Sequence, residues 1–223
     1  MELINVALAR SIWLFDLNDL NPQGKSIFPD AFSWLAEKYA FDTYPKTIGD
    51  TDPEKKGYLF KNGKFESNEE AIQVNFSIYT DGLVAETWSS TERGDLLIEE
   101  ILRSTASRYS LTFRPDMVRK KQYVNELTIR LEHPPGDLNE KISRFSELLS
   151  RLFSKHSLPP FEFTGMVFAP DTSATSYKPP GFMVERKQGA PFADNRYWSK
   201  APFPTKDHLF ALEELEKLLG SRW

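Results

Sequence analysis

The residues best suited to chemistry lie close together near the C-terminal end of the sequence. Arg186 and Arg196 could bind an anion, and His208 carries the side chain that most readily exchanges protons near neutral pH. His208 falls in the first turn of an expected helix, where free backbone amides also attract anions. The spacing therefore allows a small enzyme in which Arg186 and Arg196 clamp an anionic substrate and His208 acts as acid or base.

The sequence around these residues lacks a recognisable catalytic motif. Asp207 adjoins His208 on the expected helix, where neighbouring side chains diverge, so it cannot orient the imidazole. Ser199 could be written into a Ser–His–Asp triad, but no Gly-x-Ser-x-Gly motif surrounds it to support that role. Gly24-Lys25-Ser26 resembles part of a phosphate loop, but Asp19 stands where the first glycine belongs. We therefore expect no catalytic residue and keep the histidine acid–base role as the alternative.

The segment from Gly189 to Pro204 is unusually rich in aromatic residues. It carries Phe192, Tyr197, Trp198 and Phe203 between an expected strand and an expected helix. A coil of this length is uncommon in compact domains and is usually functional or tightly packed. The rings could form a lid on the core, or they could serve a binding surface of the kind that Tyr, Trp and Arg favour.

These observations predict a non-enzymatic protein-binding module or a subunit of a complex. The expected binding surface consists of Arg186, Asn195, Arg196, Tyr197, Trp198 and His208. The partner would be another protein or a second copy of the chain. We expect no cofactor and no metal, because the chain has no cysteine and its three histidines form no metal-binding spacing.

A second alternative is nucleic-acid binding through the basic segment 114–130. This segment contains Arg114, Arg119, Lys120, Lys121 and Arg130. Consecutive cations on a strand point to both faces, which dilutes a basic patch. The formal net charge of −4 also argues against a dedicated nucleic-acid binder. We therefore expect nucleic acid to be an improbable partner.

Composition places the chain among globular proteins. Its 223 residues are 40% hydrophobic, which is enough for a core without disulfides. We expect one domain over residues 1–223, because no linker divides the chain convincingly. The apolar runs are too short to span a membrane and no signal peptide is recognisable, so the expected location is the cytoplasm.

The hydrophobic pattern predicts an α+β fold with a mixed, mainly antiparallel sheet of hairpins packed by about four helices. Residues 3–17 are mostly apolar at both odd-numbered and even-numbered positions, which predicts a central strand covered on both faces. Asn62-Gly63 predicts a type I′ turn that makes residues 58–65 a hairpin, and Asp81-Gly82 predicts a second hairpin from residue 72 to 88. Further strands are expected over residues 123–132, 161–168 and 182–186.

Helices are expected over residues 29–40 and 95–109, from Asp137 onward, and after Thr205. The Asp137 helix has an apolar stripe that we expect to face the core: Leu138, Ile142, Phe145, Leu149 and Leu152. Thr205 is the expected cap of the last helix. Its expected buried stripe is Leu209, Leu212, Leu215 and Leu219.

Overall fold

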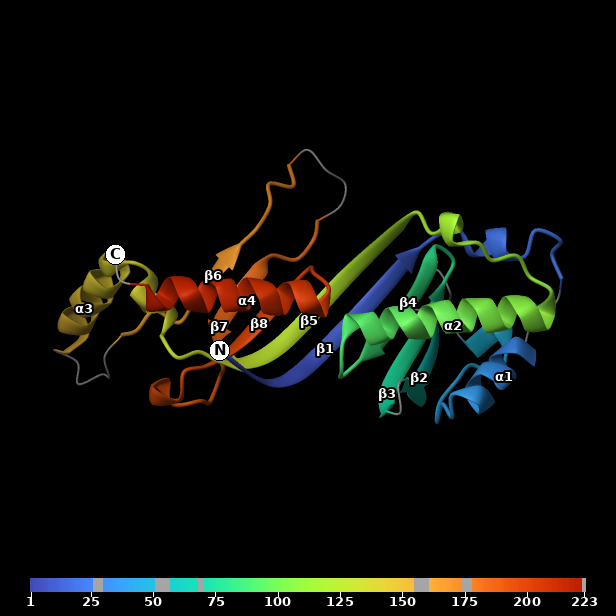
Figure 1. The fold of residues 1–223 in the computed structure, drawn as a ribbon, viewed down its shortest axis with the longest axis horizontal. Coiled ribbons are helices and arrows are strands. Elements are labelled where there is room, and N and C mark those ends of the chain that lie inside the picture. Colours follow the sequence, from blue (N-terminus) through green and yellow to red (C-terminus); the bar gives the residue numbers. More distant parts are fainter. Residues whose placement is uncertain (26–29, 51–56, 68–69, 155–160, 174–177, 222–223) are drawn as a thin grey trace. The chain divides into compact units, whose positions relative to one another are not determined.

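The computed structural model describes residues 1–25, 30–50, 57–67, 70–154, 161–173 and 178–221. Within these ranges the chain forms four α-helices and an eight-stranded antiparallel sheet with strand order β2-β3-β4-β1-β5-β8-β7-β6 (Figure 1). The expected α+β fold is confirmed. None of the helices in these ranges is long and apolar enough to cross a membrane.

The strands are β1 (Glu2–Leu14), β2 (Tyr58–Ser67), β3 (Glu70–Tyr79), β4 (Gly82–Thr87), β5 (Lys120–Arg130), β6 (Gly165–Phe168), β7 (Phe182–Arg186) and β8 (Arg196–Ala201). The α-helices are α1 (Asp30–Lys38), α2 (Thr91–Tyr109), α3 (Glu140–Ser154) and α4 (Thr205–Gly220). Short 3-10 turns are η1 (Leu17–Leu20), η2 (Ile48–Asp50), η3 (Pro115–Met117), η4 (Pro135–Leu138) and η5 (Phe192–Asp194).

The chain divides into two compact units. Unit 1 comprises residues 1–7, 126–202 and 206–223, and unit 2 comprises residues 8–125 and 203–205. Each unit has its own cluster of buried apolar side chains. The expectation of a single domain over residues 1–223 stays a prediction.

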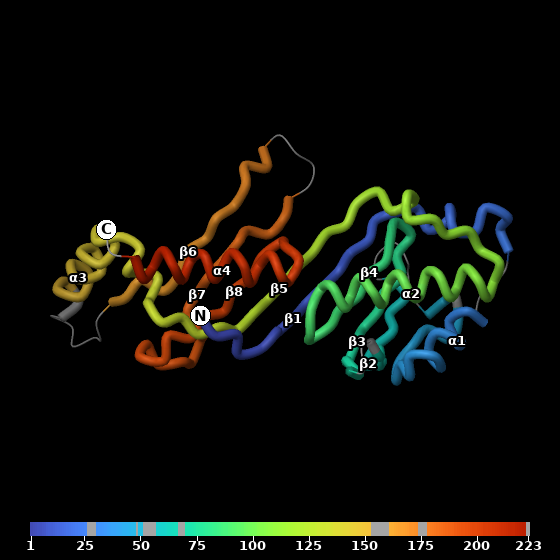
Figure 2. The backbone as a smooth tube through the Cα atoms, in the orientation of Figure 1, coloured from blue at the N-terminus to red at the C-terminus, as the bar shows by residue number. Residues whose placement is uncertain are grey.

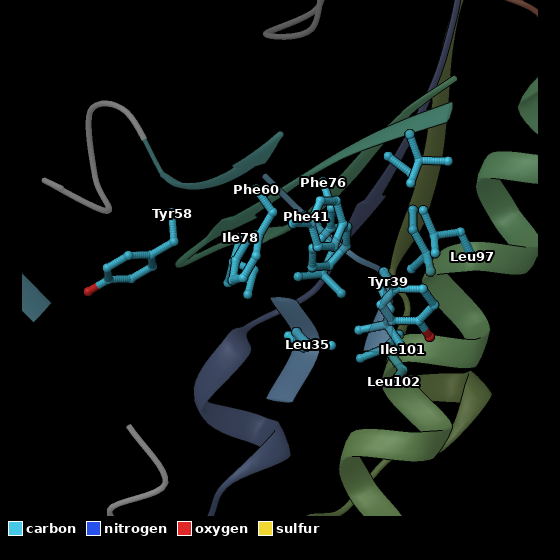
Figure 3. Close-up of a cluster of buried hydrophobic side chains, with 14 of the residues drawn as sticks. Leu35, Tyr39, Phe41, Tyr58, Phe60, Phe76, Ile78, Leu97, Ile101 and Leu102 are labelled. Carbon is cyan, nitrogen blue, oxygen red and sulfur yellow. The ribbon is translucent and has the colours of Figure 1, made fainter. Parts of the chain in front are cut away.

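In unit 2, α1 and α2 pack against β2, β3 and β4. Phe60 and Phe76 project from adjacent strands, with ring centroids 6.0 Å apart, and Phe41 lies 5.4 Å from Phe60 (Figure 3). Leu97 and Ile101 meet this cluster from α2. Ser90 begins that helix by accepting a hydrogen bond from the backbone N–H of Arg93. This cap places the start of the helix at residue 91, one turn before the expected residue 95.

The predicted hairpin within residues 58–65 is wrong. Residues 58–67 form one strand, β2, which pairs with β3 and has an irregular register between Phe60 and Gly63. Asn62 does adopt the expected positive φ, of 56°, but within a bulge and not in a turn. The hairpin at Asp81-Gly82 is confirmed, because it joins β3 to β4 in antiparallel register.

The predicted double coverage of the first strand is also wrong. In the part of β1 that belongs to unit 2, Ala9, Ser11 and Trp13 are buried, whereas Ile12 and Leu14 on the other face are only partly buried. The strand is nevertheless internal, between β4 and β5 in the sheet order. Coverage is one-sided because the helices of this unit pack on a single face.

In unit 1, α4 covers one face of the strands (Figure 1). Its buried residues Leu212, Leu215 and Leu219 pack with Leu127 and Ile129 of β5 and with neighbours on β7 and β8. Leu209 is partly buried against the same cluster. The expected apolar stripe of the last helix therefore forms this core.

The expectation that Thr205 caps the last helix stays a prediction, and the structure gives this residue contacts elsewhere. It is the first residue of α4, and its hydroxyl accepts hydrogen bonds from the backbone N–H of Thr91 and from the side-chain amide of Asn125, both at 2.9 Å. Thr205 donates its own backbone N–H to the Thr91 hydroxyl at 2.8 Å. Thr91, Asn125 and Thr205 all belong to unit 2, so these hydrogen bonds hold Thr205 within that unit.

Candidate functional site

The segment 189–204 is not a bare coil, contrary to the expectation. Residues 196–201 form β8, which pairs with β7 so that Tyr197 lies opposite Arg186 and Trp198 lies opposite Glu185. The burial of β8 alternates, with Tyr197, Ser199 and Ala201 buried. Arg196, Trp198 and Lys200 point to the other face and are partly exposed.

His208 is completely buried in unit 1. Its Nε2 lies 2.8 Å from the hydroxyl oxygen of Ser199, and its ring meets the Phe182 ring edge-on at 5.8 Å. Burial lowers the pKa of His208 to about 4, so the imidazole is neutral at physiological pH. A buried neutral histidine within a hydrogen-bond network serves packing, and this geometry does not favour an acid–base role.

Arg186 is held by its own unit. Its guanidinium lies 4.6 Å from the ring centroid of Phe192 and 4.8 Å from that of Tyr197. It donates to the Phe192 carbonyl at 2.7 Å and pairs with Glu162 at 3.4 Å, leaving its side chain 6% exposed. Little of this charge is accessible to an external anion.

The proposed arginine clamp does not converge in the structure. Arg186 lies directly opposite Tyr197, so these two side chains share a face of the β7–β8 ribbon. Arg196 precedes Tyr197 on β8 and therefore points to the opposite face. Its guanidinium is partly exposed and lies 4.0 Å from Asp194. The two arginines cannot grip one anion from these positions.

Asn195 and Tyr197 have structural contacts. Asn195 ends η5 with a positive φ of 46°, and its carbonyl accepts the backbone N–H of Leu131 at 3.0 Å. The Tyr197 ring is fully buried in the unit 1 core, and burial raises the pKa of its hydroxyl. Of the expected surface, Arg196 and Trp198 are thus the side chains best placed to meet a partner.

The basic segment 114–130 is largely neutralised by acidic neighbours. Each of four cations has a carboxylate within 4.0 Å; the pairs are Arg114 with Asp116, Arg119 with Asp19, Lys121 with Asp95, and Arg130 with Glu2. Lys121 also lies over the Trp13 ring. Pairing of this kind reduces the positive potential available for phosphate contacts.

Sequence reasoning missed the two edges of the sheet, which differ sharply. At one edge, β2 carries exposed Lys61 and Lys64 and a bulge, and Thr43 forms a bridge with Lys61. At the other edge, β6 has the sequence Gly-Met-Val-Phe, with neither a charge nor a bulge. Val167 is 61% exposed, and no described strand pairs with the outer side of β6. The lack of any charged residue in this strand was the sequence signal that could have identified β6 as an unusual edge strand.

One hydrogen bond shows which residues of β6 direct their backbone N–H and C=O groups towards β7 and which direct them outward. Arg186 N donates to Thr164 O at 2.7 Å, which makes residues 164 and 186 a hydrogen-bonded pair. Such pairs alternate along an antiparallel ladder, so Met166 and Phe168 also bond towards β7. Gly165 and Val167 therefore direct their N–H and C=O groups outward.

Part of the apolar stripe of α3 is exposed, contrary to the expectation that the whole stripe faces inward. Phe145 is 59% exposed and Leu152 is 55% exposed, and Leu148 beside them is also exposed. The helix follows η4 and lies at the extremity of unit 1 (Figure 2). Leu138 still packs against the unit 1 core. The pattern predicts an amphipathic helix, but the described residues leave Phe145 and Leu152 exposed and Ile142 and Leu149 half-buried.

A groove runs beside this helix within unit 1. It has a volume of about 500 Å³ and is lined on one side by Ile142, Phe145 and Leu149 of α3. Phe163 and Gly165 line the other side, where the chain enters β6. The groove and the outer edge of β6 thus share Gly165. A Cβ at this glycine would lie 2.8 Å from Glu185 Cα, so the residue allows β6 to approach β7 closely.

No protein-family model matches this chain, and no curated protein matches it. Among solved structures, Methanococcus jannaschii TBP is similar, with 13% sequence identity and a TM-score of 0.41. The match covers 98% of this chain and 97% of that chain.

Proposed function

We propose that this chain is a non-enzymatic protein that binds an extended segment of another protein along the outer edge of β6. The observation that carries the proposal is the contrast between the two sheet edges. Natural sheets protect exposed edges with charges, bulges or covering segments, as β2 is protected here. Within the described residues η4 approaches β6 but no strand pairs with its outer side, and an edge with neither charge nor bulge is what β-strand addition requires.

The geometry defines what the partner segment would look like. Its backbone would exchange hydrogen bonds with Gly165 and Val167, whose groups point outward. On one face its side chains would lie beside Met166 and Phe168, and the Phe168 ring is 6.2 Å from the Phe182 ring. We expect a segment with alternating apolar residues, because every second side chain would extend this apolar face.

The α3 groove supplies a second contact for the same segment. A chain that leaves the β6 edge at Gly165 meets the groove, where Ile142, Phe145 and Leu149 are available. Burying large apolar side chains such as Phe145 would contribute roughly 1.5–3 kcal/mol each. Backbone pairing therefore sets the direction of the partner, and the groove adds affinity.

The binding surface and the self-association expected from the sequence have a smaller role in this proposal. Arg196 and Trp198 remain partly exposed and could enlarge the contact on the other face of β8. A second copy of the chain is the competing occupant of the β6 edge. We propose that binding takes place in the cytoplasm, where a chain without cysteine needs no oxidising environment.

The test uses a displayed library of ten-residue peptides selected on the folded chain. Val167→Pro removes one outward N–H group without touching the β6–β7 ladder, so it should leave the melting temperature nearly unchanged. We expect the selected peptides to lose at least tenfold in affinity for this variant. Val167→Thr retains the N–H group and should bind as the original chain does.

Hydrogen exchange identifies the bound surface directly. Bound peptide should slow exchange at the amides of Gly165 and Val167, and Phe145→Ser should weaken binding without changing that pattern. Peptides that bind Val167→Pro equally well, or that protect only amides of β8, would contradict the proposal. Sedimentation that shows a dimer broken by Val167→Pro would instead assign the edge to self-association.

A further inference from the structure

Unit 2 contains a cavity of about 330 Å³ between α1, α2 and the sheet. Its walls include Leu35 of α1, Phe76 and Ile78 of β3, and Ile101 and Leu102 of α2, all labelled in Figure 3. Protein cores are close-packed and rarely leave voids much larger than a water molecule. Small-molecule sites are concave, mostly apolar and of roughly 300–1,000 Å³, and this cavity falls in that range.

A few polar side chains also line the cavity. Thr105 lines it from α2, and its hydroxyl oxygen is buried without a hydrogen-bond partner among the described residues. A helical threonine normally bonds back to a carbonyl of the preceding turn, so this unpaired hydroxyl is unusual. Buried hydroxyl groups are costly to leave unpaired, and a bound acceptor would relieve that cost.

Lys25 adds a cation to the lining of the cavity. It is the only charged residue among the described lining residues, and its ammonium donates to the carbonyl of Ser110 at 3.0 Å. Ser110 follows Thr105 by five residues, which is about 7.5 Å of helix rise. Asn21 fixes the lysine backbone, since its side chain accepts from Lys25 N at 3.0 Å and donates to Lys25 O at 2.8 Å.

We infer that unit 2 binds a small carboxylic acid with an apolar tail. The carboxylate accepts hydrogen bonds from Thr105 and from the two remaining ammonium protons of Lys25, and the tail lies among Leu35, Phe76 and Ile101. An apolar cavity of about 150 Å³ holds benzene, so this one suits roughly twelve non-hydrogen atoms. Decanoate has that size. The inference concerns unit 2 alone and is independent of the β6 edge.

Titration calorimetry of the full chain with decanoate tests the inference, with decan-1-ol and decyltrimethylammonium as probes of equal tail length. We expect decanoate to bind most tightly and the cationic probe most weakly. Lys25→Met should weaken decanoate binding about fivefold, the effect of one partly exposed ion pair. Thr105→Val should weaken it to a similar extent, because one hydrogen bond is lost.

Matched controls separate these effects from general damage. Lys61→Met removes an exposed cation that does not line the cavity, and its decanoate affinity should equal that of the original chain. Decan-1-ol should bind Lys25→Met as well as it binds the original chain. Equal affinity of the original chain for all three probes, no heat with any of them, or unchanged decanoate affinity in both Lys25→Met and Thr105→Val would overturn the inference.

Discussion

Ser199 and His208 form a closed hydrogen-bonded pair inside unit 1. The Ser199 hydroxyl donates to the Met183 carbonyl at 2.8 Å, and its oxygen lies 2.8 Å from His208 Nε2. Because the single hydroxyl proton is directed to Met183, the imidazole must donate through Nε2. These hydrogen bonds join β7, β8 and α4. In a nucleophile–base pair the imidazole nitrogen would have to accept the hydroxyl proton, and here it does not.

This arrangement predicts that stability depends on pH through His208. Burial lowers the folded-state pKa from 6.5 to about 4, so the unfolded chain binds the proton more tightly. The stabilisation is complete above about pH 6.5 and is lost as the pH falls towards about 4. The full loss is about 3 kcal/mol, at about 1.4 kcal/mol per pKa unit. Urea denaturation between pH 4 and pH 7.5 measures it.

His208→Gln is the variant for this titration, because glutamine can still donate to Ser199. Its stability should fall less between pH 6.5 and pH 4 than that of the original chain. His133→Gln is the matched control, and it should retain the full pH dependence. An identical slope in the original chain and in His208→Gln would refute the assignment.

Thr105→Val should stabilise the ligand-free chain. The hydroxyl is buried and unpaired, so its removal relieves a desolvation cost of about 1 kcal/mol or more. Thr87→Val is the opposite case, because the Thr87 hydroxyl donates to Ser90 O and accepts from Ser89 N. We expect urea midpoints to rise for Thr105→Val and to fall for Thr87→Val. A lower midpoint for Thr105→Val would mean that the hydroxyl is paired.

Local signals in the sequence predict the elements better than they predict the pairings. Asp81-Gly82 and Asn62-Gly63 carry the same turn signal, yet only the first joins two strands. At Asn62 the positive φ serves a bulge, which depends on the partner strand β3. A residue pair can predict a backbone angle, but the tertiary fold decides whether the chain reverses there.

The same limit applies to the candidate site. Segment 196–201 alternates as a strand does, but its buried positions are Tyr197, Ser199 and Ala201, a set that binary patterning does not identify as apolar. For α3, the periodicity of Phe145 and Leu152 predicts an apolar face without saying what covers it. Both errors arise because burial depends on the position of other elements.

Gly63→Ala should be strongly destabilising despite the small size of the change. A Cβ at this position would lie 2.5 Å from Phe41 Cδ1 and would force the buried ring to move. Overpacking of this kind typically costs 1–3 kcal/mol. Gly136→Ala is the matched control, because its Cβ would meet Phe163 at an ordinary 3.6 Å. Calorimetry should show a clear drop in melting temperature for the first variant only.

Arg186→Lys distinguishes a structural arginine from an anion clamp. Lysine keeps the charge but loses the planar stack between Phe192 and Tyr197 and the donor to the Phe192 carbonyl. We expect a loss of about 1–2 kcal/mol from these partly buried contacts. Arg196→Lys, at a partly exposed position, should change stability by less than about 0.5 kcal/mol. Equal stability of the two variants in urea would show that the stack contributes nothing to stability. Arg186 would then again be a candidate for binding an anion.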